Sequence, residues 1–238
     1  MDSAPDLPTT GRRADVAFVI PVYDEAQVVR GVVAKVLEHY VHVVCVNDAS
    51  HDSSAAEIEA TGAYLVNHPI NMGQGAALQT GIEFARRLPG IRYLVTYDAD
   101  GQHRLEDVAD MLAVIEAEGT DFVLGSRFLG RKAVNMPALK RFVLKLAVAF
   151  STATSGVKLT DTHNGLRVFT KKVADEIQIT MPDMAHASEI LEIIKRNHYT
   201  YTEVPVTIEY TDYSRSKGQS LLNAVNIASD TLLRKVSR

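Results

Sequence analysis

The sequence predicts an α/β protein of three layers, in which a mainly parallel central sheet is covered by helices on both faces. Two observations carry this prediction. Short apolar segments rich in β-branched residues alternate along the chain with segments of helical periodicity. Such alternation is typical of right-handed βαβ units, which build parallel sheets. The chain has 238 residues, 46% of them hydrophobic, which is sufficient for the core of one large domain.

The predicted elements follow one another in a regular order. Strands are expected at 16–22, 42–46, 63–67, 93–97 and 121–124, and helices at 25–39, 53–61, 75–87 and 105–118. The first of these helices carries Val28, Val32 and Val36 on one face. Further along, polar and apolar residues alternate over 199–210, which predicts an edge strand or hairpin that Pro205 interrupts.

Composition and hydropathy limit the class of protein. Residues 1–15 are polar and lack the basic start and apolar centre of a signal peptide, so we expect a disordered tail. Residues 16–220 are expected to form a single domain, and 221–238 a C-terminal amphipathic helix. No run approaches the roughly 18 apolar residues of a membrane span, which predicts a cytoplasmic protein. The net charge of −4 argues against a nucleic-acid partner, and the single Cys45 excludes an internal disulfide.

Two carboxylates, Asp98 and Asp100, end the apolar segment at 93–97 and precede Gly101. Because strand side chains repeat every two residues, both carboxylates are expected to point the same way at the exit of the strand. They would repel each other unless a cation lay between them, and oxygen ligands suit Mg²⁺ or Mn²⁺ completed by substrate phosphate. The residues therefore predict a metal-diphosphate site. A solvated Asp-rich turn is the alternative.

Polar, acidic or glycine-rich clusters also follow the first three predicted strands, at 21–25, 47–52 and 71–77. Because ligands of parallel α/β sheets bind outside the carboxyl ends of the strands, these clusters are expected to share one edge. Taken singly, each has a structural alternative, with Asp24 and Glu25 as helix-start acids and Asp52 or Ser53 as an N-cap. A dinucleotide-binding fingerprint is excluded at 71–77, because Leu78 stands where the third glycine belongs.

Taken together, the clusters resemble the motifs of the family 2 glycosyltransferases, which have a nucleotide-diphospho-sugar transferase (GT-A-like) fold. The motifs occur in the order of the family as Pro21 to Glu25, Asn47 to Asp52, Asn71 to Gly75 and Asp98 to His103. The resemblance covers 16–220 and makes this segment a single catalytic domain. Asp24, Gln74 and Leu105 depart from the usual Asn, Lys and Pro, and the missing lysine removes one expected contact with the donor phosphate.

The resemblance also implies a set of ligand-binding residues. The nucleotide sugar would be bound by Pro21, Tyr23, Glu25, Asp48, Gly73, Asp98 and Ala99, and the metal by Asp98, Asp100 and Gln102. Asp98 and Asp100 are accordingly the expected catalytic carboxylates. Breaking the bond between sugar and phosphate places negative charge on the departing nucleoside diphosphate, and a divalent ion offsets that charge as a Lewis acid.

Positive charge is concentrated in residues 122–160, which contain seven basic residues and no Asp or Glu. The segment 138–150 has helical periodicity and a basic face, which suits an anionic membrane surface; a core helix with a solvated basic face is the alternative. Three motifs of this half, at Gly125 to Phe128, Asp161 to Arg167 and Arg215 to Ser220, together with the basic helix, resemble those of the dolichyl- or polyprenyl-phosphate sugar synthases. The resemblance implies that the lipid phosphate is bound by Arg127, Arg141 and Lys145, and the donor diphosphate by Arg215, Lys217 and Ser220. Asp161 is interpreted as an orienting residue.

These observations predict an inverting, metal-dependent glycosyltransferase that moves a hexose from a GDP- or UDP-sugar to polyprenyl phosphate at the cytoplasmic membrane face. The inversion is implied by the family. An apolar stripe along 221–238 ends in basic residues, which predicts peripheral attachment to an anionic membrane surface or to a small membrane protein. The sequence leaves the oligomeric state open, a homo-oligomer included.

The sequence leaves two alternative functions. Transfer to a sugar hydroxyl of a growing cell-surface polysaccharide requires a general base, and Glu189 is the candidate for it; Glu189 could instead be a helix-start residue after a Ser188 cap. A regulatory protein that binds nucleotide sugars without turnover is disfavoured, because Asp98, Asp100, Arg215 and Lys217 are all present.

Overall fold

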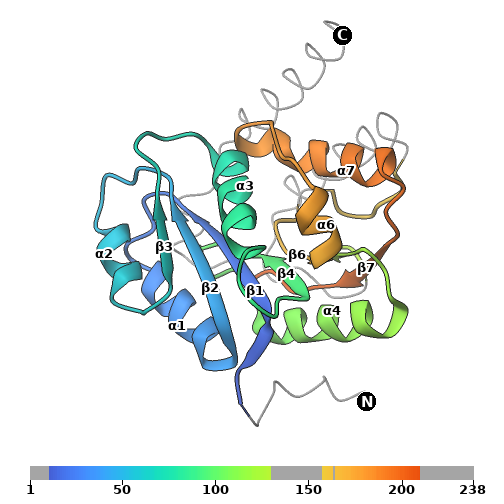
Figure 1. The fold of residues 1–238 in the computed structure, drawn as a ribbon, viewed down its shortest axis with the longest axis horizontal. Coiled ribbons are helices and arrows are strands. Elements are labelled where there is room, and N and C mark those ends of the chain that lie inside the picture. The colour runs from blue at the N-terminus through green and yellow to red at the C-terminus, as the bar shows by residue number, and fades with distance from the viewer. Residues whose placement is uncertain (1–10, 130–156, 163, 210–238) are drawn as a thin grey trace, which may run out of the picture.

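The structure is a computed structural model that describes residues 11–129, 157–162 and 164–209. In this part of the chain seven strands form one sheet in the order β3-β2-β1-β4-β6-β5-β7 (Figure 1). The strands are β1 (Arg13–Val22), β2 (Tyr40–Asn47), β3 (Tyr64–Asn67), β4 (Tyr93–Thr96), β5 (Phe122–Ser126), β6 (Arg167–Thr170) and β7 (Tyr201–Pro205). All neighbours are parallel except β6, which runs antiparallel to β4 and β5. The predicted mainly parallel sheet is confirmed.

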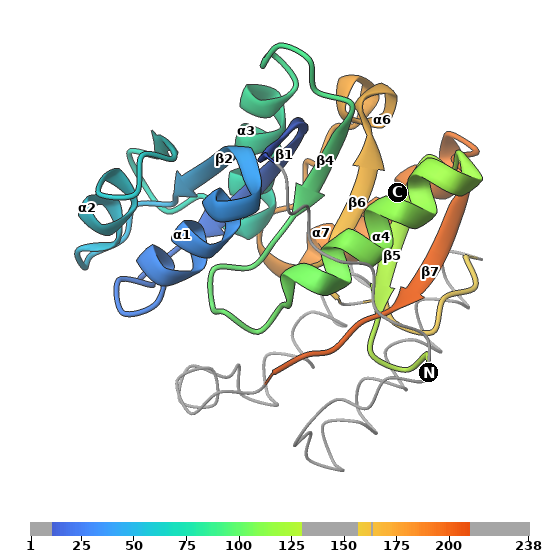
Figure 2. The same ribbon diagram turned by 90° about the horizontal axis from the view of Figure 1, so that it is seen from below.

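Helices cover both faces of the sheet and complete the predicted three layers (Figures 1 and 2). One face carries α1 (Val29–His39), α2 (Ser54–Glu59) and α4 (Leu105–Glu118), and the other α3 (Gln74–Ala85), α6 (Lys171–Glu176), the 3₁₀ turn η1 (Asp183–Ala185) and α7 (His186–Arg196). Strand alternation divides the core accordingly. Phe18 of β1 packs with Val33 and Met111 on the first face, whereas Val19 packs with Ile82 on the second.

The boundaries of the first elements differ from the prediction for local reasons. Strand β1 begins at Arg13, three residues before the predicted start, because Arg13 pairs with Tyr40 of β2 and its guanidinium forms ion pairs with Asp15 and Glu116. Helix α4 has the predicted bounds. Residues 1–10 of the expected tail lie outside the described residues.

Strand β7 is the edge strand expected within 199–210, and it pairs in parallel with β5 rather than closing a hairpin. Among the described strands, β6 is the one without a counterpart among the predicted strands. Because β6 runs antiparallel to β4 and β5, its amino end and the preceding residues 164–166 reach the edge where β4 and β5 end. The loop that precedes β6 therefore lies at the same edge of the sheet as the loops that follow β4 and β5.

The chain reverses its direction across the sheet between β1 and β4, since β2 and β3 lie on one side of β1 and β4 on the other. Such a switch point is where open α/β sheets bind ligands. The loops after β1, β2 and β4 meet there. Within the described ranges no helix has the length and apolar character of a membrane span.

Candidate active site

Asp98 and Asp100 lie on the loop between β4 and α4, where the two predicted metal ligands interact electrostatically. Asp100 accepts hydrogen bonds from the backbone N–H of Gln102 at 3.0 Å and from its Nε2 at 2.6 Å. Burial, and then the charge of Asp98, raise the pKa of Asp100 to about 6, and the charge of Glu25 acts in the same direction. Asp100 is therefore close enough to both Asp98 and Glu25 for their charges to disfavour its ionised form.

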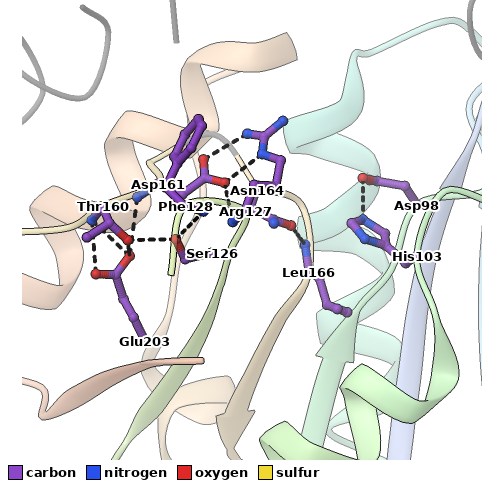
Figure 3. Close-up of polar contacts among 10 residues, drawn as sticks. All are labelled: Asp98, His103, Ser126, Arg127, Phe128, Thr160, Asp161, Asn164, Leu166 and Glu203. Atoms are coloured by element: carbon purple, nitrogen blue, oxygen red, sulfur yellow. Dashed lines mark hydrogen bonds and ion pairs between the residues drawn. The ribbon is translucent and has the colours of Figure 1, made fainter. Parts of the chain in front are cut away.

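Asp98 is held by partners from three separate segments of the chain. His103 Nε2 lies 2.9 Å from its Oδ2, and Gln74 Nε2 donates to its Oδ1 at 3.3 Å (Figure 3). A Cβ on Gly165 would come within 2.7 Å of Asp98 Oδ1, so only glycine fits here. The carbonyl of Gly165 accepts a bond from Thr96 Oγ1 at 2.7 Å. Gln74 thus supplies a neutral donor where the family has a lysine.

The electrostatics of Asp98 differ from those of Asp100. Burial raises the pKa of Asp98, but the hydrogen bond and charge of His103 and the charge of Arg167 outweigh it, so the pKa lies below its usual value. Asp98 is consequently the permanently charged member of the pair. Asp100 is the member whose charge depends on a nearby cation or on pH.

The loops after β1 and β2 are tied together by hydrogen bonds. Side-chain oxygens accept backbone N–H groups in four bonds: Asp24 N to Ser50 Oγ (3.0 Å), Glu25 N to Ser54 Oγ (2.8 Å), Ala26 N to Asp52 Oδ2 (3.0 Å) and His51 N to Asp24 Oδ1 (2.6 Å). The carboxylate of Asp24 thus holds the neighbouring loop, whereas the carbonyl of Glu25 accepts the N–H groups of Val28 (3.0 Å) and Val29 (2.9 Å) in the turn that leads into α1. Ser53 occupies the N-cap of α2 without a side-chain bond.

This interlocked pair of loops carries an exposed aromatic rim. Tyr23 is 42% exposed, and its hydroxyl lies 3.3 Å from Nδ1 of His51. The two rings meet edge to face, with centroids 5.9 Å apart. Pro21, near the end of β1, and Glu25, on the loop that follows it, are half-buried. Three of the predicted nucleotide-binding residues therefore lie at the carboxyl end of β1.

Asp48, one of the predicted nucleotide-binding residues, is buried and accepts backbone hydrogen bonds. It is 3% exposed, and its two oxygens accept the backbone N–H groups of Met72 (2.9 Å) and Gly73 (2.8 Å). Its Oδ1 also lies 2.6 Å from Nδ1 of His68. Asp48 therefore holds the loop before α3, and a direct bond to a nucleoside would have to replace one of these.

The start of α3 is covered by a distant segment of the chain. Gly73 has a φ of 88°, and a Cβ there would lie 2.8 Å from the backbone nitrogen of Asp183. A Cβ on Gly75 would overlap the carbonyl of Met181. The two glycines therefore serve close packing of the segment before α7. That packing brings His186 near Asp98, whose pKa its charge lowers.

The second cluster of charges lies after β5 and before β6. Arg127 donates to Asp161 from Nε (2.6 Å), Nη2 (2.7 Å) and its backbone N–H (3.1 Å) (Figure 3). Glu203 of β7 accepts the backbone N–H groups of Thr160 (2.9 Å) and Asp161 (3.2 Å). Bidentate geometry of this kind fixes the plane of a guanidinium. The interpretation of Asp161 as an orienting residue agrees with these contacts, and the residue that it orients is Arg127.

The order of the four motifs and the grouping of their side chains at one sheet edge agree with a family comparison. Residues 17–178 match the model of the family described as Glycosyl transferase family 2. The chain belongs to this family. It is therefore a glycosyltransferase, and the predicted enzyme class is confirmed.

Relatives of this glycosyltransferase extend over almost its whole length. It is 31% identical over 228 residues to the uncharacterized protein MJ1222 of Methanocaldococcus jannaschii, and the alignment covers 93% of each chain. It is 31% identical to the UDP-N-acetylglucosamine–dolichyl-phosphate N-acetylglucosaminyltransferase of Methanococcus voltae, with 94% of this chain and 97% of the relative covered. The resemblance to the polyprenyl-phosphate sugar synthases is thus confirmed.

A solved structure supports the fold. The glucosyl-3-phosphoglycerate synthase of Mycobacterium tuberculosis, in complex with Mn²⁺ and UDP-glucose, superimposes with a TM-score of 0.69. The identity is 15%, and the alignment covers 94% of this glycosyltransferase and 78% of the other chain. The predicted GT-A-like fold is confirmed by this likeness together with the family match.

Glu189 of the glycosyltransferase lies in the first turn of α7, as one of its two interpretations required. The helix begins at His186, however, so Ser188 is inside it and is not its cap. The carboxylate of Glu189 is buried and accepts bonds from the backbone N–H groups of Thr180 (3.0 Å) and Met181 (2.8 Å). It is thus engaged in holding the chain before α7.

Several predicted residues of the enzyme lie outside the described part of the chain: Arg141, Lys145, Arg215, Lys217 and Ser220, with the helices at 138–150 and 221–238. Conversely, sequence reasoning assigned no role to His103, Gly165 or Glu203. The alternation of polar and apolar residues around Glu203 does not predict that it binds Thr160 and Asp161. His103 stood within a quoted motif, and its position five residues after Asp98 was the available signal.

Proposed function

We propose that this glycosyltransferase is inverting and metal-dependent, and that it moves a hexose from a GDP- or UDP-sugar to polyprenyl phosphate at the cytoplasmic membrane face. The observation that carries the proposal is the arrangement of a carboxylate pair, Asp98 and Asp100, with the oriented guanidinium of Arg127 around one sheet edge. The carboxylates suit a metal-bound diphosphate and the guanidinium suits a second phosphate.

The names of relatives support a lipid phosphate as acceptor. One is an N-acetylglucosaminyltransferase for dolichyl phosphate. Another, the polyprenol monophosphomannose synthase of Mycolicibacterium smegmatis, is 28% identical over 88% of this chain and 81% of its own. Both names imply a phosphate at the end of an isoprenoid. Arg127 is the described residue that we assign to it, with Arg141 and Lys145 beyond the described residues.

The residues present fit a divalent ion. Asp98, Asp100 and Gln102 offer oxygen atoms, and the pKa of Asp100 is raised by burial and then by the charge of Asp98, so a cation between the two carboxylates would stabilise their charged forms. Among the described residues no group of three His, Cys, Asp or Glu could hold a metal. The two carboxylates and the amide would thus need phosphate oxygens to complete a Mg²⁺ or Mn²⁺ site. The ion would offset charge on the leaving nucleoside diphosphate.

The chain's own residues then position two phosphates. An oxygen of the acceptor phosphate attacks the anomeric carbon, and the bond from that carbon to the donor diphosphate breaks in the same displacement. No enzyme nucleophile takes part, so the configuration inverts. A phosphate monoester is already ionised near neutral pH and needs no general base. The engagement of Glu189 by Thr180 and Met181 agrees with this chemistry.

Donor binding is assigned to the interlocked loops. Tyr23, Pro21 and Glu25 would contact the nucleoside, Asp98 and Ala99 the ribose and diphosphate, and Gly73 the phosphate side. Asp48 would act by holding the loop that contains Gly73. The loop with Arg215, Lys217 and Ser220 would close on the diphosphate.

Peripheral attachment to an anionic membrane surface, or to a small membrane protein, completes the proposal. Purified protein should pellet with vesicles that contain anionic lipid at low salt, and much less in high salt, because exposed charge interactions are screened. Recovery of all the protein in the supernatant at low salt would contradict direct attachment.

The deciding experiment is transfer of label from UDP- and GDP-hexoses with Mg²⁺ or Mn²⁺, with a short polyprenyl phosphate and a free oligosaccharide as competing acceptors. Label in the lipid fraction that is lost with EDTA is the expected result. Label only in the oligosaccharide would contradict the acceptor assignment. It would make a general base necessary and Glu189 the residue to test.

A further inference from the structure

Two buried hydrogen-bond donors without partners lie on the segment that leads into β6. Among the described residues, the buried polar atoms that lack a hydrogen bond include Nδ2 of Asn164 and Nη1 of Arg167. Asn164 is 5% exposed and Arg167 is 4% exposed. A buried donor left unsatisfied costs about 1–3 kcal/mol, and more for a charged group. Native proteins rarely leave two such donors three residues apart unless a ligand or water accepts from them.

The orientation of the Asn164 amide is fixed by its neighbour. Its Oδ1 accepts the backbone N–H of Leu166 at 2.9 Å. Because an N–H can only donate, the atom facing it must be the oxygen. The unpaired end is therefore the NH₂ group, which requires an acceptor.

Arg167 is a buried cation without an ion-pair partner in the described part of the chain. Both oxygens of Asp161 are engaged by Arg127, and those of Asp98 by Gln74 and His103. Burial lowers the pKa of Arg167 to about 10, and the charges of Asp98 and Asp161 oppose this without reversing it. The guanidinium therefore interacts electrostatically with one carboxylate from each side of the site, Asp98 on the metal-diphosphate side and Asp161 on the Arg127 side.

The surroundings of the two donors point to the acceptor side. Asn164 is three residues after Asp161, which holds Arg127, and in the view of Figure 3 it lies between the Arg127–Asp161 pair and the Asp98–His103 pair. Gly165 follows and is packed against the Asp98 carboxylate. An anion bound by these donors would thus lie next to the donor diphosphate without occupying its place.

We propose that Asn164 and Arg167 bind the phosphate of the acceptor, by donating hydrogen bonds from Nδ2 and Nη1 to its oxygens, and that Arg127 binds the same phosphate. This inference rests on the proposed function for the identity of the acceptor. A phosphate monoester has three terminal oxygens, so it can accept from all three side chains at once. The three donors would fix its orientation for attack on the anomeric carbon.

The test measures the affinity for geranyl phosphate, a soluble ten-carbon prenyl phosphate, and separately for the nucleoside diphosphate that the wild type prefers. Asn164→Asp keeps an oxygen for the Leu166 N–H but removes the donor and adds charge, whereas Asn164→Ala removes the donor without adding charge. Arg167→Lys keeps the charge but not the second nitrogen. Asn197→Asp, at the exposed end of α7, is the matched control.

Each variant at Asn164 should raise the Kd for geranyl phosphate by about tenfold or more, and Arg167→Lys by about threefold or more, with nucleotide affinity and melting temperature close to wild type. Unchanged geranyl phosphate affinity in folded Asn164→Asp overturns the inference. So does an equal loss of nucleotide affinity, which would indicate a structural role. Should Arg167→Lys not fold, the Asn164 variants decide.

Failure of the proposed function would be seen in the wild type itself. A wild-type protein that transfers sugar to an oligosaccharide and does not bind geranyl phosphate contradicts the acceptor assignment. A wild-type protein that binds geranyl phosphate, with variants at Asn164 that bind it equally well, contradicts only the present inference.

Discussion

The donor side and the acceptor side of the site differ in how their charged side chains are held. On the donor side, Asp24, Asp48 and Asp52 each accept backbone N–H groups, so several separate bonds tie the loops together. On the acceptor side, Asp161 accepts the backbone N–H of Arg127 and also forms a buried ion pair with its guanidinium. Loss of one of several bonds leaves a loop tied by the others, whereas a buried ion pair loses its geometry with either partner. The acceptor side should therefore be the more sensitive to single substitutions.

The largest effect is expected from substitution of Asp100, one of the two predicted metal ligands. Asp100→Asn should lower kcat by about 10²–10³-fold, because it removes a charge that would hold the divalent ion. The same variant should melt at a higher temperature than the wild type without metal, because it relieves repulsion with Asp98. Thermal melting with and without Mn²⁺ checks this, since the ion should stabilise only the wild type. Asp175→Asn, at an exposed position of α6, is the control.

The second prediction concerns the ion pair. Asp161→Asn should raise the KM for the prenyl phosphate by at least about tenfold, because Arg127 loses its bidentate partner and its orientation. The KM for the nucleotide sugar should stay within about twofold. The donor-side counterpart Asp52→Asn, which can still accept one N–H, should change both constants less. A larger effect of Asp52→Asn on the acceptor KM would break the distinction between the two sides.

A third and smaller effect is a pH dependence of stability that arises on the acceptor side, at Glu203. Burial raises the pKa of Glu203, which accepts the N–H groups of Thr160 and Asp161, whereas its Gln variant keeps an accepting oxygen. A carboxyl whose pKa is raised in the folded state contributes stability below its ordinary value of 4.5 and loses it as pH rises through the folded value. Wild type should lose stability relative to Glu203→Gln as pH rises from about 4 to 7. Parallel melting curves would contradict this.

The smallest effect is expected at Glu189. Glu189→Gln should change kcat by less than about threefold with prenyl phosphate, because an ionised acceptor needs no base. Its Oε1 can still accept from Thr180 or Met181. A loss of more than about 100-fold in a protein that melts like the wild type would identify a general base and therefore a hydroxyl acceptor.

Much of the donor side could be predicted from the sequence, because its residues follow strands with strong apolar patterns. The pairing of Asp98 with Asp100 needed only strand periodicity and the end of β4. The inward placement of Asp48 could not be foreseen, since it depends on the path of the chain before α3. The bonds of Glu189 to residues before α7 depend in the same way on where that helix begins.

The acceptor side resisted prediction for a topological reason. Strand β6 is four residues long and antiparallel, and its pairing with β4 and β5 depends on tertiary contacts rather than on its own periodicity. Without that pairing, nothing in the sequence places Gly165 against Asp98 or Asp161 beside Arg127. Motif spacing located these residues along the chain and left their partners undetermined.

The reversed direction of β6 has a consequence for how such enzymes can diversify. The chain leaves the sheet at Ser126 and returns at Arg167, and both points lie in neighbouring strands at one edge. The residues between them form one continuous stretch of the sequence. Replacement of this stretch by that of another family member, with Gly165 kept because it packs against Asp98, would exchange Arg127, Asp161 and Asn164 while leaving β1 to β4 in place. Hybrid enzymes joined at these two points are therefore a direct route to new pairings of donor and acceptor.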